Sequence, residues 1–208
     1  MPYEFPLCQI VPLPDNQVSL QIDGVERTRW HFDARYPRPF FYPFNGPSGE
    51  TLTRMGHPGA PNHDHHRSVW WAHAKVDGEN YWGDETKTRI RQTQWLAYDN
   101  GDAEAIMATR AGWFNAAGKE ILEQEMIASV RPAPEGETFL ELQSTFTPID
   151  KPVTFEQSNF GVLAVRVAHG VAAFWGDGKI TSSEGTEGEP QIFGQSAAWM
   201  DYSGAVPR

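Results

Sequence analysis

The sequence predicts an all-β protein, an antiparallel β-sandwich that forms one domain over residues 1–208. Sixteen prolines and 19 glycines are spread along the 208 residues, which suits many short strands joined by turns and disfavours long helices. Four extended runs also follow one another in the middle of the chain, with turn-forming residues between them. The length fits one sandwich, since all-β domains of this size commonly fold as a single unit.

The first strands are expected at residues 5–12 and 17–32. Apolar residues alternate with polar ones in the stretch QVSLQI, and Asp23-Gly24 is a hairpin turn signal. Residues 35–49, RYPRPFFYPFNGPSG, are rich in aromatic residues and proline. Because proline pushes the residue before it into an extended conformation, an edge strand followed by a loop is expected there.

The clearest pattern is an antiparallel meander of four strands, at residues 89–98, 103–114, 120–131 and 138–147. Successive side chains of a strand point to opposite faces. In the third strand this predicts a core face made of Leu122, Met126, Ala128 and Val130. The opposite face carries Glu123, Glu125 and Arg131, and it is either a solvent-facing surface or a ligand surface.

Four further elements are expected: a strand or short helix near residues 68–75, and strands at 160–168, 172–181 and 197–202. No linker divides the chain, which favours one domain. The chain stops directly after an expected strand, so we expect the domain to be incomplete at its C-terminus.

Composition excludes several classes of partner. Seventeen basic against 27 acidic side chains give a net charge of −10, whereas nucleic acids and anionic membranes attract clustered Lys and Arg. Cys8 is the only cysteine, which rules out a disulfide within the chain and a thiolate metal cluster. No signal peptide or membrane-spanning run is visible, so a cytoplasmic protein is expected.

The most chemically informative stretch runs from His57 to His73, HPGAPNHDHHRSVWWAH, and holds five of the seven histidines. Imidazole can accept a proton, donate one or bind a metal near neutral pH. The segment is therefore interpreted as a metal-free acid/base and ligand-binding site. Two alternatives remain: a divalent metal ion held by His63, His65 and His66, or histidines with a structural role.

Arginine and tryptophan add to this stretch. The planar guanidinium of Arg67 suits a carboxylate or a pair of sugar hydroxyls, or else an ion pair with Asp64, Asp77 or Glu79. Eight tryptophans are many for this length, and indole rings serve as stacking surfaces for sugars or as core residues. No nucleophile-elbow motif, phosphate-binding loop or dinucleotide motif is present.

Four blocks of the chain resemble the bacterial family DUF6807, whose members are also called PmoA family proteins. The blocks are RPFFYPFNGPSGETLTR, HDHHRSVWWAHAKVDGENYW, SNFGVLAVRVA and the pair SSEG and GQSAAWMDYSG. The family is similar to the galactose-mutarotase β-supersandwich, which implies that fold and work on carbohydrates. Family chains continue past the last block, which also points to a truncated C-terminus. The name PmoA refers to a methane monooxygenase subunit that is an integral membrane protein. That name does not fit a chain in which no membrane-spanning run is visible.

The resemblance also implies roles, because mutarotase-like folds hold sugar oxygens with an arginine and histidines and use a glutamate as base. The catalytic residues expected on this basis are His65, His66 and Arg67, and the meander pattern adds Glu125 as the glutamate, with Glu184 as the alternative. The substrate-binding residues expected are His63, Trp70, His73 and Arg166.

The function expected from the sequence is acid/base proton transfer on a sugar or glycoside, of the mutarotase, epimerase or lyase type. No cofactor is needed for this, and the expected partner is a small carbohydrate. The alternatives are a metal-dependent β-sandwich enzyme and a non-catalytic carbohydrate-binding module.

Overall fold

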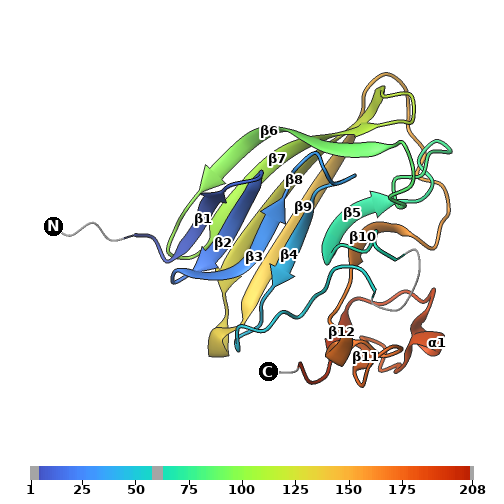
Figure 1. Cartoon of the computed structure of the whole chain (residues 1–208). Coiled ribbons are helices and arrows are strands. Elements are labelled where there is room, and N and C mark those ends of the chain that lie inside the picture. Colours follow the sequence, from blue (N-terminus) through green and yellow to red (C-terminus); the bar gives the residue numbers. More distant parts are fainter. Residues whose placement is uncertain (1–4, 58–62, 207–208) are drawn as a thin grey trace.

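The computed structural model describes residues 5–57 and 63–206, and it confirms an all-β fold built from antiparallel sheets (Figure 1). Six strands form the first sheet, in the order β1 (Cys8–Leu13), β2 (Gln17–Ile22), β3 (Val25–His31), β4 (Phe40–Phe44), β5 (Val69–His73) and β10 (Gly161–Val165). Four form the second sheet, in the order β6 (Arg89–Asp99), β7 (Ala105–Phe114), β8 (Glu120–Pro132) and β9 (Thr138–Pro148).

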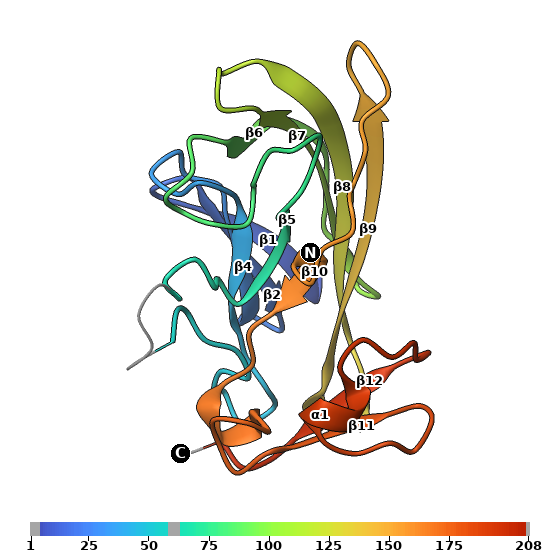
Figure 2. The ribbon, with the colours of Figure 1, turned by 90° about the vertical axis from the view of Figure 1, so that its right-hand side faces the viewer.

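The second sheet is the predicted meander, and it packs face to face on the first sheet (Figure 2). Met126, Ala128 and Val130 of β8 are buried in one apolar cluster with β1 and β2 residues such as Ile10 and Leu20. The predicted core face of β8 is therefore confirmed. Burying such apolar side chains between two sheets is the main stabilising contribution in a sandwich.

The outer side of the first sheet is also covered. Phe41 of β4 points into the sandwich core, whereas its neighbour Phe40 packs with Trp70 and Ala72 of β5 in a separate cluster. This follows from the alternation of side chains along a strand. The loop before β5, which contains most of the histidines, lies over this outer aromatic cluster, because the His66 ring stacks on Trp70.

Strand β10 adds to the edge of β5 in antiparallel register, with Gly161 opposite His73. A side chain at Gly161 would place its Cβ 2.3 Å from the imidazole of His73, and the residue has a positive φ of 146°. Glycine is required there because only it combines this backbone conformation with such a close approach. The pairing continues to Val165 opposite Val69, and Arg166 directly after it donates its backbone N–H to the carbonyl of Ser68, at the end of the loop that carries the histidines.

The C-terminal part differs from the expectation. The strand expected at 172–181 is wrong over most of its length, because only β11 (Lys179–Ser182) forms, and it pairs with β12 (Met200–Ser203). Before β11 comes the short 3-10 helix η2 (His169–Val171), and α1 (Glu189–Ile192) follows β11. Figures 1 and 2 show this unit at one end of the sandwich, and another 3-10 turn, η1 (Pro134–Gly136), joins β8 to β9. None of the helices found in the described residues is long and apolar enough to cross a membrane.

Candidate functional site

Four imidazoles gather in the loop between β4 and β5. The ring centroids of His65 and His66 lie 4.4 Å apart, and that of His63 lies 5.0 Å from His66. His57 comes within 5.6 Å of His63. The structure therefore brings together four of the five histidines of this segment. The intervening residues 58–62 lie outside the described part of the chain.

His66 has the most perturbed chemistry of the four. Burial lowers the pKa of His66 to about 3, and the positive charges of neighbouring histidines and of Arg166 act in the same direction. Its Nδ1 is buried and has no hydrogen-bond partner within the described segments. Burial also lowers the pKa of His65, with Arg38 contributing. Both imidazoles are thus neutral at physiological pH, and each can offer one donor and one acceptor nitrogen.

Aromatic rings form the floor beneath these histidines. Trp70 stacks against His66 with ring centroids 5.7 Å apart, and Trp82 lies 5.2 Å from Trp70. Phe160, just before β10, lies 5.5 Å from Trp82 and is exposed. Trp70 was predicted to bind substrate through its ring, but the side chain is almost fully buried. Trp70 therefore supports His66 from below, and Phe160 offers the accessible aromatic surface.

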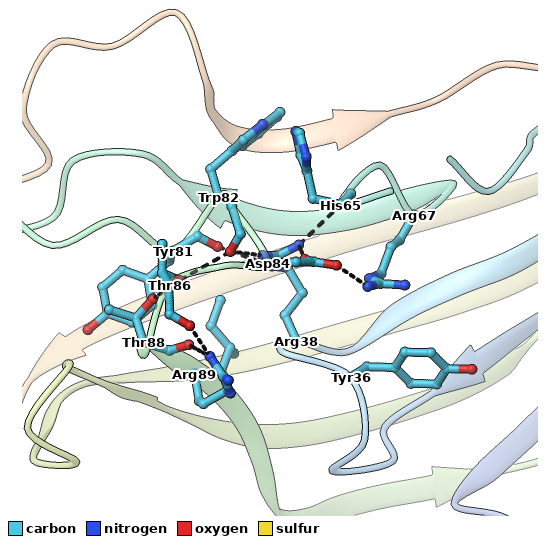
Figure 3. A network of polar contacts seen from close by, with 12 residues as sticks. Tyr36, Arg38, His65, Arg67, Tyr81, Trp82, Asp84, Thr86, Thr88 and Arg89 are labelled. Carbon is cyan, nitrogen blue, oxygen red and sulfur yellow. Dashed lines mark hydrogen bonds and ion pairs between the residues drawn. The ribbon is translucent and has the colours of Figure 1, made fainter. Parts of the chain in front are cut away.

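Arg67 is held by a carboxylate from another loop (Figure 3). Asp84 receives a hydrogen bond from Arg67 Nη2 through one oxygen, and its other oxygen lies 3.0 Å from Nη1 of the buried Arg38. Of the ion-pair partners considered for Arg67, Asp77 instead pairs with Lys151. The partner is thus Asp84, 17 residues further along the chain, which no sequence pattern indicated.

Arg38 links the same two loops through the backbone. Its guanidinium donates to the carbonyl oxygens of Tyr81 at 3.1 Å, Gly83 at 2.9 Å and His65 at 3.3 Å. The network fixes the position of the His65 backbone relative to Trp82, as Figure 3 shows. Arg67 also lies over the ring of Tyr36. Arg67 therefore positions the histidine loop, and its terminal nitrogen is already engaged by Asp84.

A second pair of arginines stands beside the histidines without such a carboxylate. Arg54 donates its backbone N–H to the carbonyl of Arg166, and Ser68 donates its backbone N–H to the carbonyl of Arg54. The two arginines thus emerge from adjacent backbone segments. Nε and Nη2 of both side chains are buried and have no hydrogen-bond partner among residues 5–57 and 63–206. Burial lowers the pKa of both, and Arg54 lowers that of Arg166 further.

Arg166 lines a cavity of about 250 Å³ between the end of β10 and the β11–β12 unit. Its other walls include Phe174, Trp175, Glu189 and Tyr202. The ring of Trp175 also lies 4.9 Å from that of His57. Cavity and imidazole cluster therefore adjoin, and together they form a concave region with polar groups over apolar walls, as in small-molecule sites.

The remaining predicted residues lie elsewhere. His73 shares the inward face of β5, where its ring contacts Phe155 at 5.4 Å and its Nδ1 accepts the backbone N–H of Lys75. Glu125 lies on the outer face of β8 and pairs with Arg110 at 2.8 Å. Glu184 is exposed in the turn after β11. The structure thus brings His63, His65, His66, Trp70 and Arg166 together, but not His73, Glu125 or Glu184.

The metal alternative finds no geometric support. Across the described residues, no group of three or more His, Cys, Asp or Glu side chains is arranged so that it could hold a metal ion. The imidazole rings of His65 and His66 contact each other instead, edge to face, with 82° between their planes.

The fold and the site define a β-sandwich protein with an imidazole and guanidinium site at one edge of its larger sheet. The chain belongs to DUF6807, a family of unknown function, whose family model matches residues 17–208. The predicted family membership is therefore confirmed. No curated protein and no solved structure gave a significant match.

Proposed function

We propose that this protein acts on a sugar or glycoside by acid/base proton transfer, with His66 and His65 as the proton-transferring groups. The observation that carries the proposal is the neutral, half-buried His66 beside the unpaired guanidinium of Arg166, at the edge of a cavity. The resemblance of the family to galactose-mutarotase-like proteins points in the same direction.

The chemistry of the site suits a hydroxyl-rich ligand. Among the described residues, buried nitrogens without a hydrogen-bond partner occur on His66, Trp70 and Trp82, whose rings contact one another, and on Arg54 and Arg166, whose backbones are hydrogen-bonded. Most of them are hydrogen-bond donors, so they call for a ligand rich in acceptor oxygens. Exposed aromatic rings at Phe160 and Trp175 supply the flat apolar surfaces on which sugar rings pack.

Each residue has a specific part in this proposal. The neutral imidazole of His66 or His65 takes a proton from a sugar hydroxyl or carbon, and the imidazolium so formed returns that proton to the ring or carbonyl oxygen, while the other imidazole donates a hydrogen bond to that oxygen. Arg166 stabilises the negative charge that develops on that oxygen. Arg67 acts through position, because with Asp84 and Arg38 it holds the loop that carries both histidines. Glu125 has no part in it.

The test is product analysis by NMR after incubation of the protein with a panel of neutral and acidic sugars and glycosides. His66→Gln is expected to lower turnover of the active substrate by about 10²–10⁴-fold, the usual contribution of a general acid or base. His169→Gln is the matched control, because His169 is exposed in η2. Wild-type turnover by His66→Gln would contradict the assignment of His66.

A second candidate, a non-catalytic carbohydrate-binding module, is favoured by one observation. Phe174 and Trp175 at the cavity are 66% and 53% exposed, as in a stacking surface that needs no catalytic group. It predicts saturable sugar binding in calorimetry, lost in Trp175→Ala and retained in His66→Gln. Turnover of any sugar in the panel would exclude it.

A further inference from the structure

We propose that the sugar bound at this site carries a carboxylate, and that Arg54 and Arg166 hold it together. This inference rests on the proposed function and names its substrate class. The observation behind it is a pair of neighbouring arginines whose buried N–H groups have no acceptor within the part of the chain that the structure describes.

The backbone fixes the spacing of the two arginines. Arg54 N donates to Arg166 O at 3.0 Å, Arg166 N donates to Ser68 O at 2.6 Å, and Ser68 N donates to Arg54 O at 3.1 Å. Ser68 is itself fully buried, and its hydroxyl donates to Thr53 Oγ1 at 2.7 Å. The two guanidinium groups thus start from a rigid junction of three segments, which holds them in place before a ligand arrives.

Charge balance separates this pair from the other arginines near the site. Arg38 and Arg67 share Asp84, so two positive charges face one negative charge. Arg54 and Arg166 form no ion pair with any described residue, although Glu189 lies on the cavity wall and acts electrostatically on Arg166. Two unpaired cations that are partly withdrawn from water are costly, and an anion between them removes that cost.

A carboxylate fits this arrangement best. Its two oxygens match the planar fork of a guanidinium, and hydrogen bonds between charged groups are shorter and stronger than those between neutral groups. The attraction must be local, because the whole chain carries a net charge of −10 and repels anions at long range. The apolar walls next to Arg166, including Val165 and Ile192, suit the carbon face of a sugar ring.

The experiment is calorimetric titration of the wild-type protein with D-galacturonate and D-glucuronate, each compared with its neutral counterpart, D-galactose or D-glucose. We expect an acid to bind about tenfold or more tightly than its neutral counterpart, as charge-assisted hydrogen bonds provide. Arg54→Gln and Arg166→Gln should each remove most of this preference, and Arg166→Lys should retain part of it, because the charge remains while the fork is lost. Arg131→Gln, on β8, is the control.

A stability measurement shows whether the variants are folded. Because Arg166 leaves no ion-pair partner behind among the described residues, Arg166→Gln should unfold at the same denaturant concentration as wild type or a higher one. Equal affinity for acids and neutral sugars would overturn the carboxylate inference alone. A preference for galactose 6-sulfate over the acids would overturn it too, in favour of a sulfate ester. Tight acid binding without turnover of any sugar would uphold the inference and contradict the enzymatic proposal.

Discussion

Replacing Arg38 by Met is expected to destabilise the protein more than any surface arginine replacement. The Arg38 side chain is 1% exposed and lies 3.0 Å from Asp84. It also donates to three backbone carbonyls, those of Tyr81, Gly83 and His65. Methionine can fill part of the same volume, but it offers no donor to these four acceptors.

The magnitude follows from what is left unpaired. Removing one partner of a buried ion pair costs about 3–5 kcal/mol. A buried carbonyl left without its donor costs about 1 kcal/mol or more. Asp84 keeps Arg67 as a partner, which limits the loss. We therefore expect a decrease of about 4 kcal/mol in the free energy of unfolding. For a chain of this length that corresponds to a fall in Tm of roughly 8–16 °C.

Urea unfolding followed by tryptophan fluorescence measures this loss, with Arg131→Met as the control. Arg131 forms an exposed ion pair with Glu141, so its replacement should cost about 1 kcal/mol or less. A change below about 1 kcal/mol for Arg38→Met, equal to the control, would refute the view that this buried network joins the two loops.

Three further predictions concern other residues. Since burial lowers the pKa of His66 below its unfolded value, the unfolded state binds more protons between pH 3 and 6.5, and stability is lost as the pH falls through that window. Because the ring is half-buried, we expect the free energy of unfolding to fall by about 1 kcal/mol by pH 5. The fall should be smaller in His66→Gln, and urea unfolding at each pH measures both. Gly161→Ala should cost about 2–4 kcal/mol in the same assay, since its Cβ would meet His73. Glu125→Gln should leave turnover unchanged in the NMR assay, because Glu125 pairs with Arg110 on the far sheet.

Periodicity predicted the meander well because its signal is local. The alternation in β8 assigns Leu122 and Met126 to the core and Glu125 to the outer face, and the structure agrees. The expected strand over 172–181 failed for the same reason. The apolar run at its start suggested extension, but most of this segment forms turns before β11 begins at Lys179.

The candidate site was only partly predictable. His65 and His66 stand out because histidines are scarce and these are adjacent, and Arg166 was expected as a polar residue in the cleft. Arg54 and Asp84 carry no local signal, since their importance depends on backbone pairing with Arg166 and on an ion pair across 17 residues. His73 follows His66 closely in the chain, but the alternation of β5 turns its ring to the other face of the sheet, so the structure does not bring it together with the other histidines.

The four arginines around the histidines divide according to what their surroundings provide. Arg38 and Arg67 have a carboxylate between them, and Arg38 also reaches three carbonyls, so most of their burial is compensated within the fold, although Arg67 Nε has no acceptor among the described residues. The positive charge of Arg54 further lowers the pKa of Arg166, and neither arginine has such compensation in the described chain. Groups that violate the rules of stable folding in this way are characteristic of binding sites, where the ligand completes the missing interactions. The contrast therefore supports the proposal that Arg38 and Arg67 hold the loops together, whereas Arg54 and Arg166 bind the ligand beside His66.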